Sequence, residues 1–217
     1  MQRGSSRSDH GSRVRRLALT CVIASSTAVL AGETFAQKVA AVPAASELAA
    51  SPRHANPIPA WTEFCTRYPT ECTVDASQPA VITLTATTWS TILEVNRRVN
   101  KSVRPDRDDW GVADRWDLTE DGSGDCEDFQ LLKRKLLADA GLPRRAMRMT
   151  VVIDERDEGH AVLMIRTDRG DFILDNKTSA VLPWSKTGYI FVKREGQDRT
   201  AWVSLGGVLS PVATANP

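Results

Sequence analysis

The chain has 217 residues, of which 41% are apolar and 25% charged, as in an ordinary globular protein rather than a disordered one. Its formal net charge of +1 is typical neither of a strongly basic nucleic-acid-binding protein nor of an acidic tail. Its 13 glycines and 11 prolines exclude a collagen-like sequence, and 4 cysteines are too few for a disulfide scaffold. We therefore expect a globular domain with one buried core and no nucleic-acid partner.

The first 36 residues have the order of a secretory signal peptide. Arginines dominate residues 1–16, an uncharged stretch of apolar and small residues follows over 17–31, and Thr34 and Ala36 precede the expected cleavage site. The apolar stretch is too short, and too rich in Ser and Thr, for a membrane span. The sequence thus predicts a cleaved signal over 1–36, a periplasmic or secreted protein, and no membrane span in the mature chain. An uncleaved anchor or a misassigned start codon is the alternative.

The region after the signal divides into a lead-in and one domain. Residues 37–59 are rich in Ala and Pro without a period, which is typical of a flexible lead-in, and the domain is expected over 60–217. In its first half, apolar residues recur at three- and four-residue steps over 89–103 and again over 126–140. Both segments are predicted to be amphipathic helices, the second of them with Leu132 on its apolar face.

The second half changes from helical to strand period. Strands are predicted over 147–154, 160–167 and 171–175, and a short polar turn makes the last two a hairpin. Residues 189–193 and 201–204 are weaker strand candidates. Helices followed by an antiparallel sheet indicate an α+β fold.

Cys126 is the candidate nucleophile. It follows a glycine-bearing loop and lies in the first turn of the second predicted helix, where N–H groups and the helix dipole lower the pKa of a thiol. Flanking carboxylates oppose the thiolate, so that a neighbouring cation would resolve the conflict. A buried, inert helix cysteine is the alternative. The backbone N–H of Cys126 is the natural oxyanion donor, and Trp110 and Trp116 are candidates for the second, or else core aromatics.

His160 and Asp175 are the candidate base and its orienting carboxylate. His160 begins one strand of the predicted hairpin, and Asp175 ends the other. If Thr167 faces Gly170, then Val162 faces Asp175, and His160 becomes its diagonal neighbour on the same face. Such neighbours lie about 7–8 Å apart at the base of their side chains, within reach of a hydrogen bond. A thiol beside an imidazole that a carboxylate orients is an activated nucleophile. The alternative is that His160 is a buried structural residue whose hydrogen bonds are satisfied within the core.

A series of motifs carries a resemblance to a known family, the bacterial transglutaminase-like cysteine proteinases. The matching segments, in order, are Trp61–Cys65, Tyr68–Cys72, Val95–Asn100, Trp110–Trp116, Gly124–Phe129, Gly159–Leu163 and Leu174–Asn176. The resemblance covers roughly residues 60–204. It implies a papain/transglutaminase-like core, with N-terminal helices and the nucleophile at a helix start, packed on an antiparallel sheet.

The resemblance also implies roles for single residues. On the family pattern Cys126 is the nucleophile, His160 the base and Asp175 its orienter. The best-understood members are periplasmic, calcium-dependent proteases of surface adhesins, in which the acidic residues beside the nucleophile help to bind calcium; these correspond to Asp125 and Glu127. Many other members have no assigned substrate.

Two further features bear on metals and cysteine pairing. Carboxylates crowd the loop before and after the nucleophile, and hard oxygen ligands suit calcium, although a solvated acidic loop is the alternative. These residues are Asp117, Glu120, Asp121, Asp125, Glu127 and Asp128. Cys65 and Cys72 flank a short loop, so that in an exported protein we expect them to form a disulfide. Zinc is not expected, because no other Cys or His lies near them.

The sequence therefore predicts an exported cysteine peptidase. It would cleave a protein substrate, in the family's case a surface adhesin, through an acyl-enzyme; the chemistry needs no cofactor, and calcium is a candidate ion. One alternative is transglutaminase- or amidase-type acyl transfer through the same three residues. Another is a non-catalytic, calcium-binding interaction domain, which would be expected to lack one of the three.

Overall fold

The computed structural model describes residues 42–44, 46, 53–106, 114–119, 122–198 and 201–206. The predicted signal peptide over 1–36 and the candidate donor Trp110 lie outside these residues. No helix in the described ranges is long and apolar enough to cross a membrane.

The described helices include the two that the sequence predicts and two that it does not. They are α1 (Pro59–Arg67), α2 (Pro69–Cys72), α3 (Ala86–Ser102) and α4 (Cys126–Asp139). The unpredicted α1 and α2 each begin with a proline, whose fixed φ and missing N–H suit the first position of a helix. Helix α3 begins where the Thr85 hydroxyl accepts a hydrogen bond of 3.1 Å from the Thr88 N–H.

Most of the strands belong to a single sheet. In chain order the strands are β1 (His54–Ala55), β2 (Arg104–Pro105), β3 (Ser123–Gly124), β4 (Met147–Ile153), β5 (Gly159–Thr167), β6 (Gly170–Leu174), β7 (Leu182–Pro183), β8 (Ile190–Glu195) and β9 (Trp202–Ser204). Among the described residues, seven of them form an antiparallel sheet in the order β1-β9-β8-β4-β5-β6-β7. Strands β2 and β3 form a separate parallel pair. The five predicted strands are confirmed as β4, β5, β6, β8 and β9. Strand β1 lies within the stretch predicted to be a lead-in.

The register of the β5–β6 hairpin is the predicted one. Thr167 pairs with Gly170, and the pairing continues to Leu163 opposite Leu174. One further step along each strand sets Val162 opposite Asp175. This register matters for function because it places His160 and Asp175 on one face at the same end of the hairpin.

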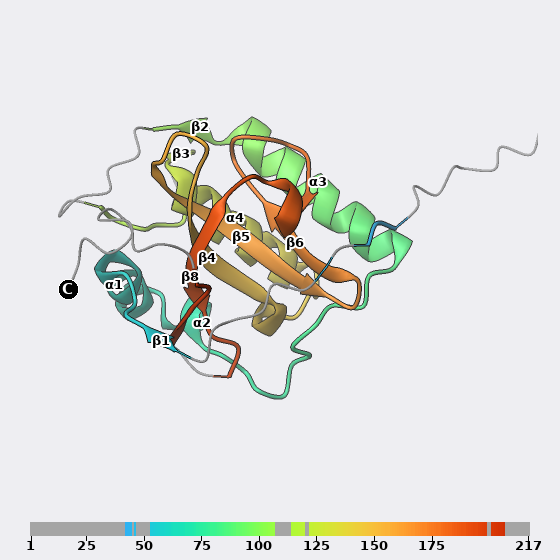
Figure 1. Ribbon diagram of the computed structural model, residues 1–217, viewed down its shortest axis with the longest axis horizontal. Helices are drawn as coiled ribbons and strands as arrows, with labels where there is room; N and C mark the ends of the chain where they lie inside the picture. The colour runs from blue at the N-terminus through green and yellow to red at the C-terminus, as the bar shows by residue number, and fades with distance from the viewer. Residues whose placement is uncertain are drawn as a thin grey trace, which may run out of the picture. The chain divides into compact units, whose positions relative to one another are not determined.

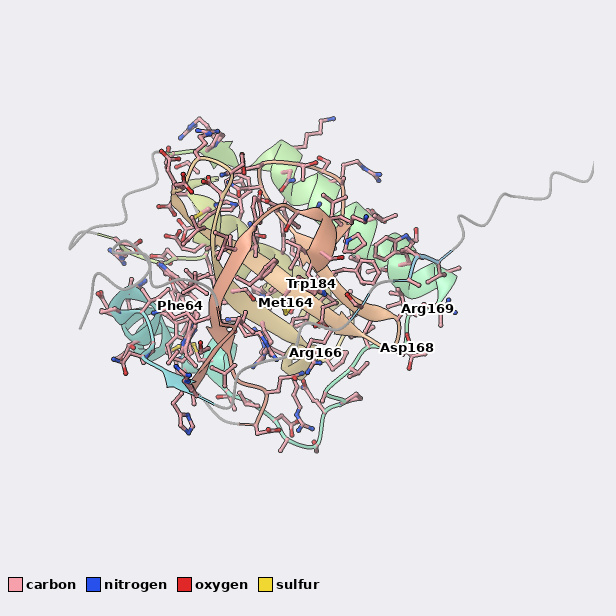
Figure 2. The ribbon with its side chains drawn as sticks, viewed as in Figure 1. Phe64, Met164, Arg166, Asp168, Arg169 and Trp184 are labelled. Carbon is pink, nitrogen blue, oxygen red and sulfur yellow. A yellow bond between two sulfur atoms is a disulfide. The ribbon has the colours of Figure 1, made fainter. Side chains whose placement is uncertain are left out.

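The sheet has one face covered by the long helices. Helix α4 packs on β5, and α3 packs on α4, as Figure 1 shows. Side chains that point toward the helices, such as Leu163 and Ile165, join the larger core cluster. Their neighbours along the strand point to the opposite face. There Met164 joins a second, smaller cluster, against which Trp184 packs (Figure 2).

The β5–β6 turn anchors the segment that leads into α3. The Asp168 carboxylate accepts a hydrogen bond of 2.9 Å from the Leu84 N–H, and the Ile82 N–H bonds to the Arg166 carbonyl. Arg166, Asp168 and Arg169 lie along this end of the hairpin in Figure 2.

The helices that pack on one face of the antiparallel sheet confirm the predicted α+β fold.

Candidate active site

Cys126 is the first residue of α4 and lies in the protein interior. Its side chain is fully buried, and its Sγ accepts a hydrogen bond of 3.3 Å from the Ala161 N–H of β5. The turn before it requires glycine, because a Cβ on Gly124 would come within 2.7 Å of the Asp128 Cβ. The thiol is thereby held at a helix N-terminus, next to the strand residue that follows His160. Its position is the one that favours a thiolate.

His160 and Asp175 are in contact. The imidazole Nε2 and the Asp175 Oδ1 lie 2.9 Å apart, and both side chains are almost completely buried. Burial alone would raise the pKa of Asp175, but hydrogen bonds from His160, Tyr189 and the Lys177 N–H, together with the His160 charge, lower it to about 2. Asp175 is therefore ionised at neutral pH and accepts a hydrogen bond from Nε2–H; in the neutral imidazole with this tautomer, Nδ1 is the nitrogen without a proton. Nδ1 is buried and has no hydrogen-bond partner in the described part of the chain.

Asp125 and Glu127, the predicted metal ligands, lie together at the start of α4. A third carboxylate, Asp114, joins them, so that one oxygen from each lies within 4.8 Å of the others. Burial, then the proximity of Asp125 and Asp114, raises the pKa of Glu127 well above its usual value. Its Oε1 is buried and receives no hydrogen bond from the described residues, while its Oε2 accepts the Cys126 thiol at 3.4 Å. Asp114 belongs to the Trp110–Trp116 segment of the family resemblance, but the sequence did not predict it as a metal ligand.

Two other acidic residues of this loop, Asp117 and Asp128, make hydrogen bonds within the protein and do not belong to the cluster. Asp117 binds Arg67 at 2.9 Å and the Tyr68 hydroxyl at 2.7 Å. The Asp128 carboxylate accepts the Asp117 N–H at 2.6 Å, and burial raises its pKa to about 7. Glu120 and Asp121 lie outside the described residues. Of the six acidic residues predicted for this loop, Asp125 and Glu127 thus join Asp114 in the cluster, whereas Asp117 and Asp128 make hydrogen bonds that fix the loop itself.

Trp116 is a core aromatic and not an open oxyanion donor. Its ring is completely buried, and its Nε1 donates a hydrogen bond of 3.2 Å to the Asp114 carboxylate. A donor already used in this way is not available to a developing oxyanion. The backbone N–H of Cys126, at the helix start, remains the donor that the sequence indicates.

Cys65 and Cys72 form the predicted disulfide. Arg67 and Tyr68 lie within the loop that it closes, and both contact the segment that carries Asp114: Arg67 donates to the Trp116 carbonyl at 2.5 Å, and both residues bind Asp117. The disulfide thus fixes the part of the chain that holds one wall of the acidic cluster. Among the described residues, Cys126 is the cysteine that forms no disulfide.

The sequence matches the family model of the bacterial transglutaminase-like cysteine proteinases over residues 51–209. The chain is a member of this family. No curated protein matches it significantly. Among solved structures, calcium-bound LapG from Legionella pneumophila is similar, with 24% identity and a TM-score of 0.48 over 56% of this chain and 72% of that one. EGTA-treated LapG from the same organism is 27% identical, with a TM-score of 0.46 over 54% and 67% of the two chains.

Membership of the bacterial transglutaminase-like cysteine proteinases makes the chain a cysteine peptidase. A peptidase of this class needs a thiol nucleophile and a base. Cys126, the first residue of α4, and His160, on β5, are the candidates for these two roles.

Proposed function

We propose that this proteinase hydrolyses peptide bonds with Cys126 as nucleophile, His160 as general base and acid, and Asp175 as the residue that orients the imidazole. The observation that carries the proposal is the 2.9 Å contact between His160 Nε2 and Asp175. This contact leaves Nδ1 without a hydrogen-bond partner among the described residues, while the Cys126 thiol is bonded to the N–H of Ala161, the residue that follows His160. The same arrangement of thiol, oriented imidazole and carboxylate recurs on unrelated folds.

The chemistry follows from these atoms. Cys126 transfers its proton to His160 Nδ1, and the thiolate attacks the scissile carbonyl carbon. The Cys126 backbone N–H stabilises the resulting oxyanion. The C–N bond then breaks, the leaving amine takes the proton from Nδ1, and a thioester remains on Cys126. Water that loses a proton to Nδ1 hydrolyses the thioester, and the proton returns to the thiol.

We also propose that Asp114, Asp125 and Glu127 hold a calcium ion. The donor set fits, because three carboxylates converge and one buried oxygen of Glu127 receives no hydrogen bond from the described residues. When bound, the ion would supply positive charge that offsets these carboxylates next to the thiol. The chain's own contribution is to hold the three oxygens together, through the start of α4 and the bond from Trp116 to Asp114.

The predicted signal peptide and the family resemblance support a periplasmic or secreted enzyme whose substrate is a protein, specifically a surface adhesin. Acyl transfer to an amine would use the same three residues. A large excess of a primary amine in the reaction separates the two outcomes, since hydrolysis releases a free carboxyl terminus and transfer leaves an amide.

The deciding experiment is to incubate the surface proteins of the source cell with wild type, Cys126→Ala and Asp175→Asn. We expect new fragments with wild type, none with Cys126→Ala, and cleavage slowed by orders of magnitude with Asp175→Asn, which presents the wrong tautomer. Circular dichroism confirms that each variant is folded. Fragments that persist with folded Cys126→Ala would rule out the thiol as nucleophile.

Calcium binding is tested separately by thermal unfolding with added Ca²⁺ or EGTA. We expect Ca²⁺ to raise the Tm of wild type and of Glu158→Gln, whose carboxylate is exposed on a turn, but not that of Glu127→Gln. An equal rise in all three proteins would exclude the proposed ligands.

A further inference from the structure

Tyr189 contacts both the proposed base, His160, and the carboxylate that orients it, Asp175. Its hydroxyl donates a hydrogen bond of 2.6 Å to Asp175 Oδ2, and its ring meets the His160 imidazole edge-on, with centroids 5.8 Å apart. The residue lies just before β8, a strand that pairs with β4 and β9 and not with the β5–β6 hairpin. A separate part of the sheet therefore holds the histidine–carboxylate pair.

The two oxygens of Asp175 have different partners. Oδ1 accepts from His160 and from the Lys177 N–H at 3.0 Å, whereas Tyr189 is the one donor to Oδ2 among the described residues. Burial and the Asp175 charge raise the pKa of Tyr189 far above its usual value, so the phenol stays protonated and always donates. Without this bond Oδ2 would have no donor among the described residues, and the carboxylate would be held through Oδ1 alone, by His160 and the Lys177 N–H.

The backbone of Asp175 is fixed from the opposite side, by α3. The Asn100 side chain donates to the Asp175 carbonyl at 2.8 Å and to the Thr178 carbonyl at 2.9 Å. With the main chain held there, the remaining freedom of Asp175 is the rotation of its carboxylate. Two donors oppose that rotation, the Lys177 N–H on Oδ1 and the Tyr189 hydroxyl on Oδ2.

We propose that Tyr189 is a positioning residue of the peptidase reaction, which acts through Asp175 by fixing the carboxylate that orients His160. The inference rests on the proposed function, because it assigns no separate chemistry to the phenol. It predicts that the effect of Tyr189 disappears when Asp175 can no longer orient the imidazole.

A double-mutant cycle tests this with wild type, Tyr189→Phe, Asp175→Asn and the double variant. The measured quantity is the rate of Cys126 alkylation by iodoacetamide, a small reagent that can be used without knowing the substrate. The Tm is measured on the same preparations. We expect Tyr189→Phe to slow alkylation about tenfold, equivalent to about 1.4 kcal/mol. Asp175→Asn should slow it further, and the double variant should match Asp175→Asn.

Thr178→Val is the matched control. It removes a hydroxyl from the loop after Asp175, where that hydroxyl accepts from the Ala180 N–H, and it leaves the carbonyl that binds Asn100. Its alkylation rate should stay within about twofold of wild type, the usual limit of independent effects.

The outcomes are distinguishable. A Tyr189→Phe rate within about twofold of wild type would overturn the inference, and so would a double variant slower than Asp175→Asn by the full Tyr189→Phe factor. The second result would mean that Tyr189 acts independently of Asp175. An Asp175→Asn rate equal to that of wild type would instead overturn the proposed function itself.

Discussion

Lys133 lies on α4 with its side chain completely buried, and Lys133→Met tests what that burial costs. Its Nζ donates a hydrogen bond of 3.2 Å to Gln130 Oε1 and lies 5.9 Å from the centroid of the Phe129 ring. No carboxylate of the described residues is within ion-pair distance of it. Burial therefore dominates and lowers the pKa of Lys133 from 10.5 to about 7, although the Asp175 charge acts in the opposite direction.

The magnitude follows from proton linkage. Each tenfold change in a proton equilibrium is worth about 1.4 kcal/mol, so the lowered pKa corresponds to a folding cost of about 4 kcal/mol at pH 7. Above pH 10.5 the amine is neutral in both states and this cost vanishes. As the pH falls toward about 7, the unfolded chain takes up a proton that the folded chain does not, so stability is lost.

Methionine fills a similar volume without a charge. We expect Lys133→Met to raise the free energy of unfolding by about 2–4 kcal/mol at pH 7, and the gain to shrink as the pH approaches 10. The measurement is urea unfolding of both proteins at several pH values between 7 and 10, with the disulfide kept oxidised.

The control is Lys135→Met, on the same helix but exposed and paired with Asp139. Such surface pairs are worth about 0–1 kcal/mol, and its effect should not change with pH over most of this range. A difference between Lys133→Met and wild type that stays constant from pH 7 to 10 would refute the reasoning, because it would show that Lys133 is charged in the folded state throughout.

Two further changes test the framework around the site. Glu195 is buried and accepts hydrogen bonds from Arg134 at 2.7 Å and from the Met149 N–H at 2.9 Å, so that Glu195→Gln strands a buried cation. We expect a loss of about 3–5 kcal/mol in urea unfolding, and a loss under about 1 kcal/mol would show that Arg134 finds another partner. Replacing both Cys65 and Cys72 by serine should cost about 2–3 kcal/mol by loop-closure entropy and weaken calcium binding, measured by calorimetry. Unchanged calcium affinity would separate the disulfide from the acidic cluster.

The hairpin that holds the candidate base and carboxylate was predictable because its geometry is local. A short turn fixes which residues face each other, and a period of two then fixes their faces all along both strands. The positions of His160 and Asp175 follow from that arithmetic, and the observed register agrees with it. Cys126 was equally accessible, since a glycine-bearing loop before an amphipathic helix marks a helix start.

What could not be predicted depends on contacts between distant segments. The periodicity of α4 puts Leu132 on the buried face, but Leu132 is only partly buried, whereas Leu131 and Lys133 are fully buried. Helix α4 lies between the sheet and α3, so more than one face is enclosed. The partner that makes a buried Arg134 tolerable is Glu195, 61 positions along the chain.

Asp114 and Tyr189 were missed for the same reason. Asp114 lies close to Asp125, and the neighbouring Trp116 and Asp117 are bound by Arg67, the last residue of α1, and by Tyr68, which follows it. The Ala- and Pro-rich stretch before α1 conceals this helix in the sequence. The proline at position 59, directly before the Ala60–Trp61 pair that faces the core, was the available signal.

The proposed nucleophile and the proposed base are held by different parts of the chain. Cys126 and Glu127 are consecutive on one helix, and the contact between Sγ and Oε2 means that a shift of the acidic cluster also shifts the nucleophile. Asp175 reaches the base from the sheet, and its supports come from Tyr189 and Asn100, which lie on neither α4 nor the acidic loop. Removing Ca²⁺ from the proposed site should therefore displace the proposed nucleophile while leaving the proposed base oriented, and Tyr189→Phe should do the reverse. In the proposed mechanism both displacements slow the same proton transfer, from Sγ to Nδ1. A loss of rate alone therefore does not distinguish them, whereas the dependence of that loss on Ca²⁺ does.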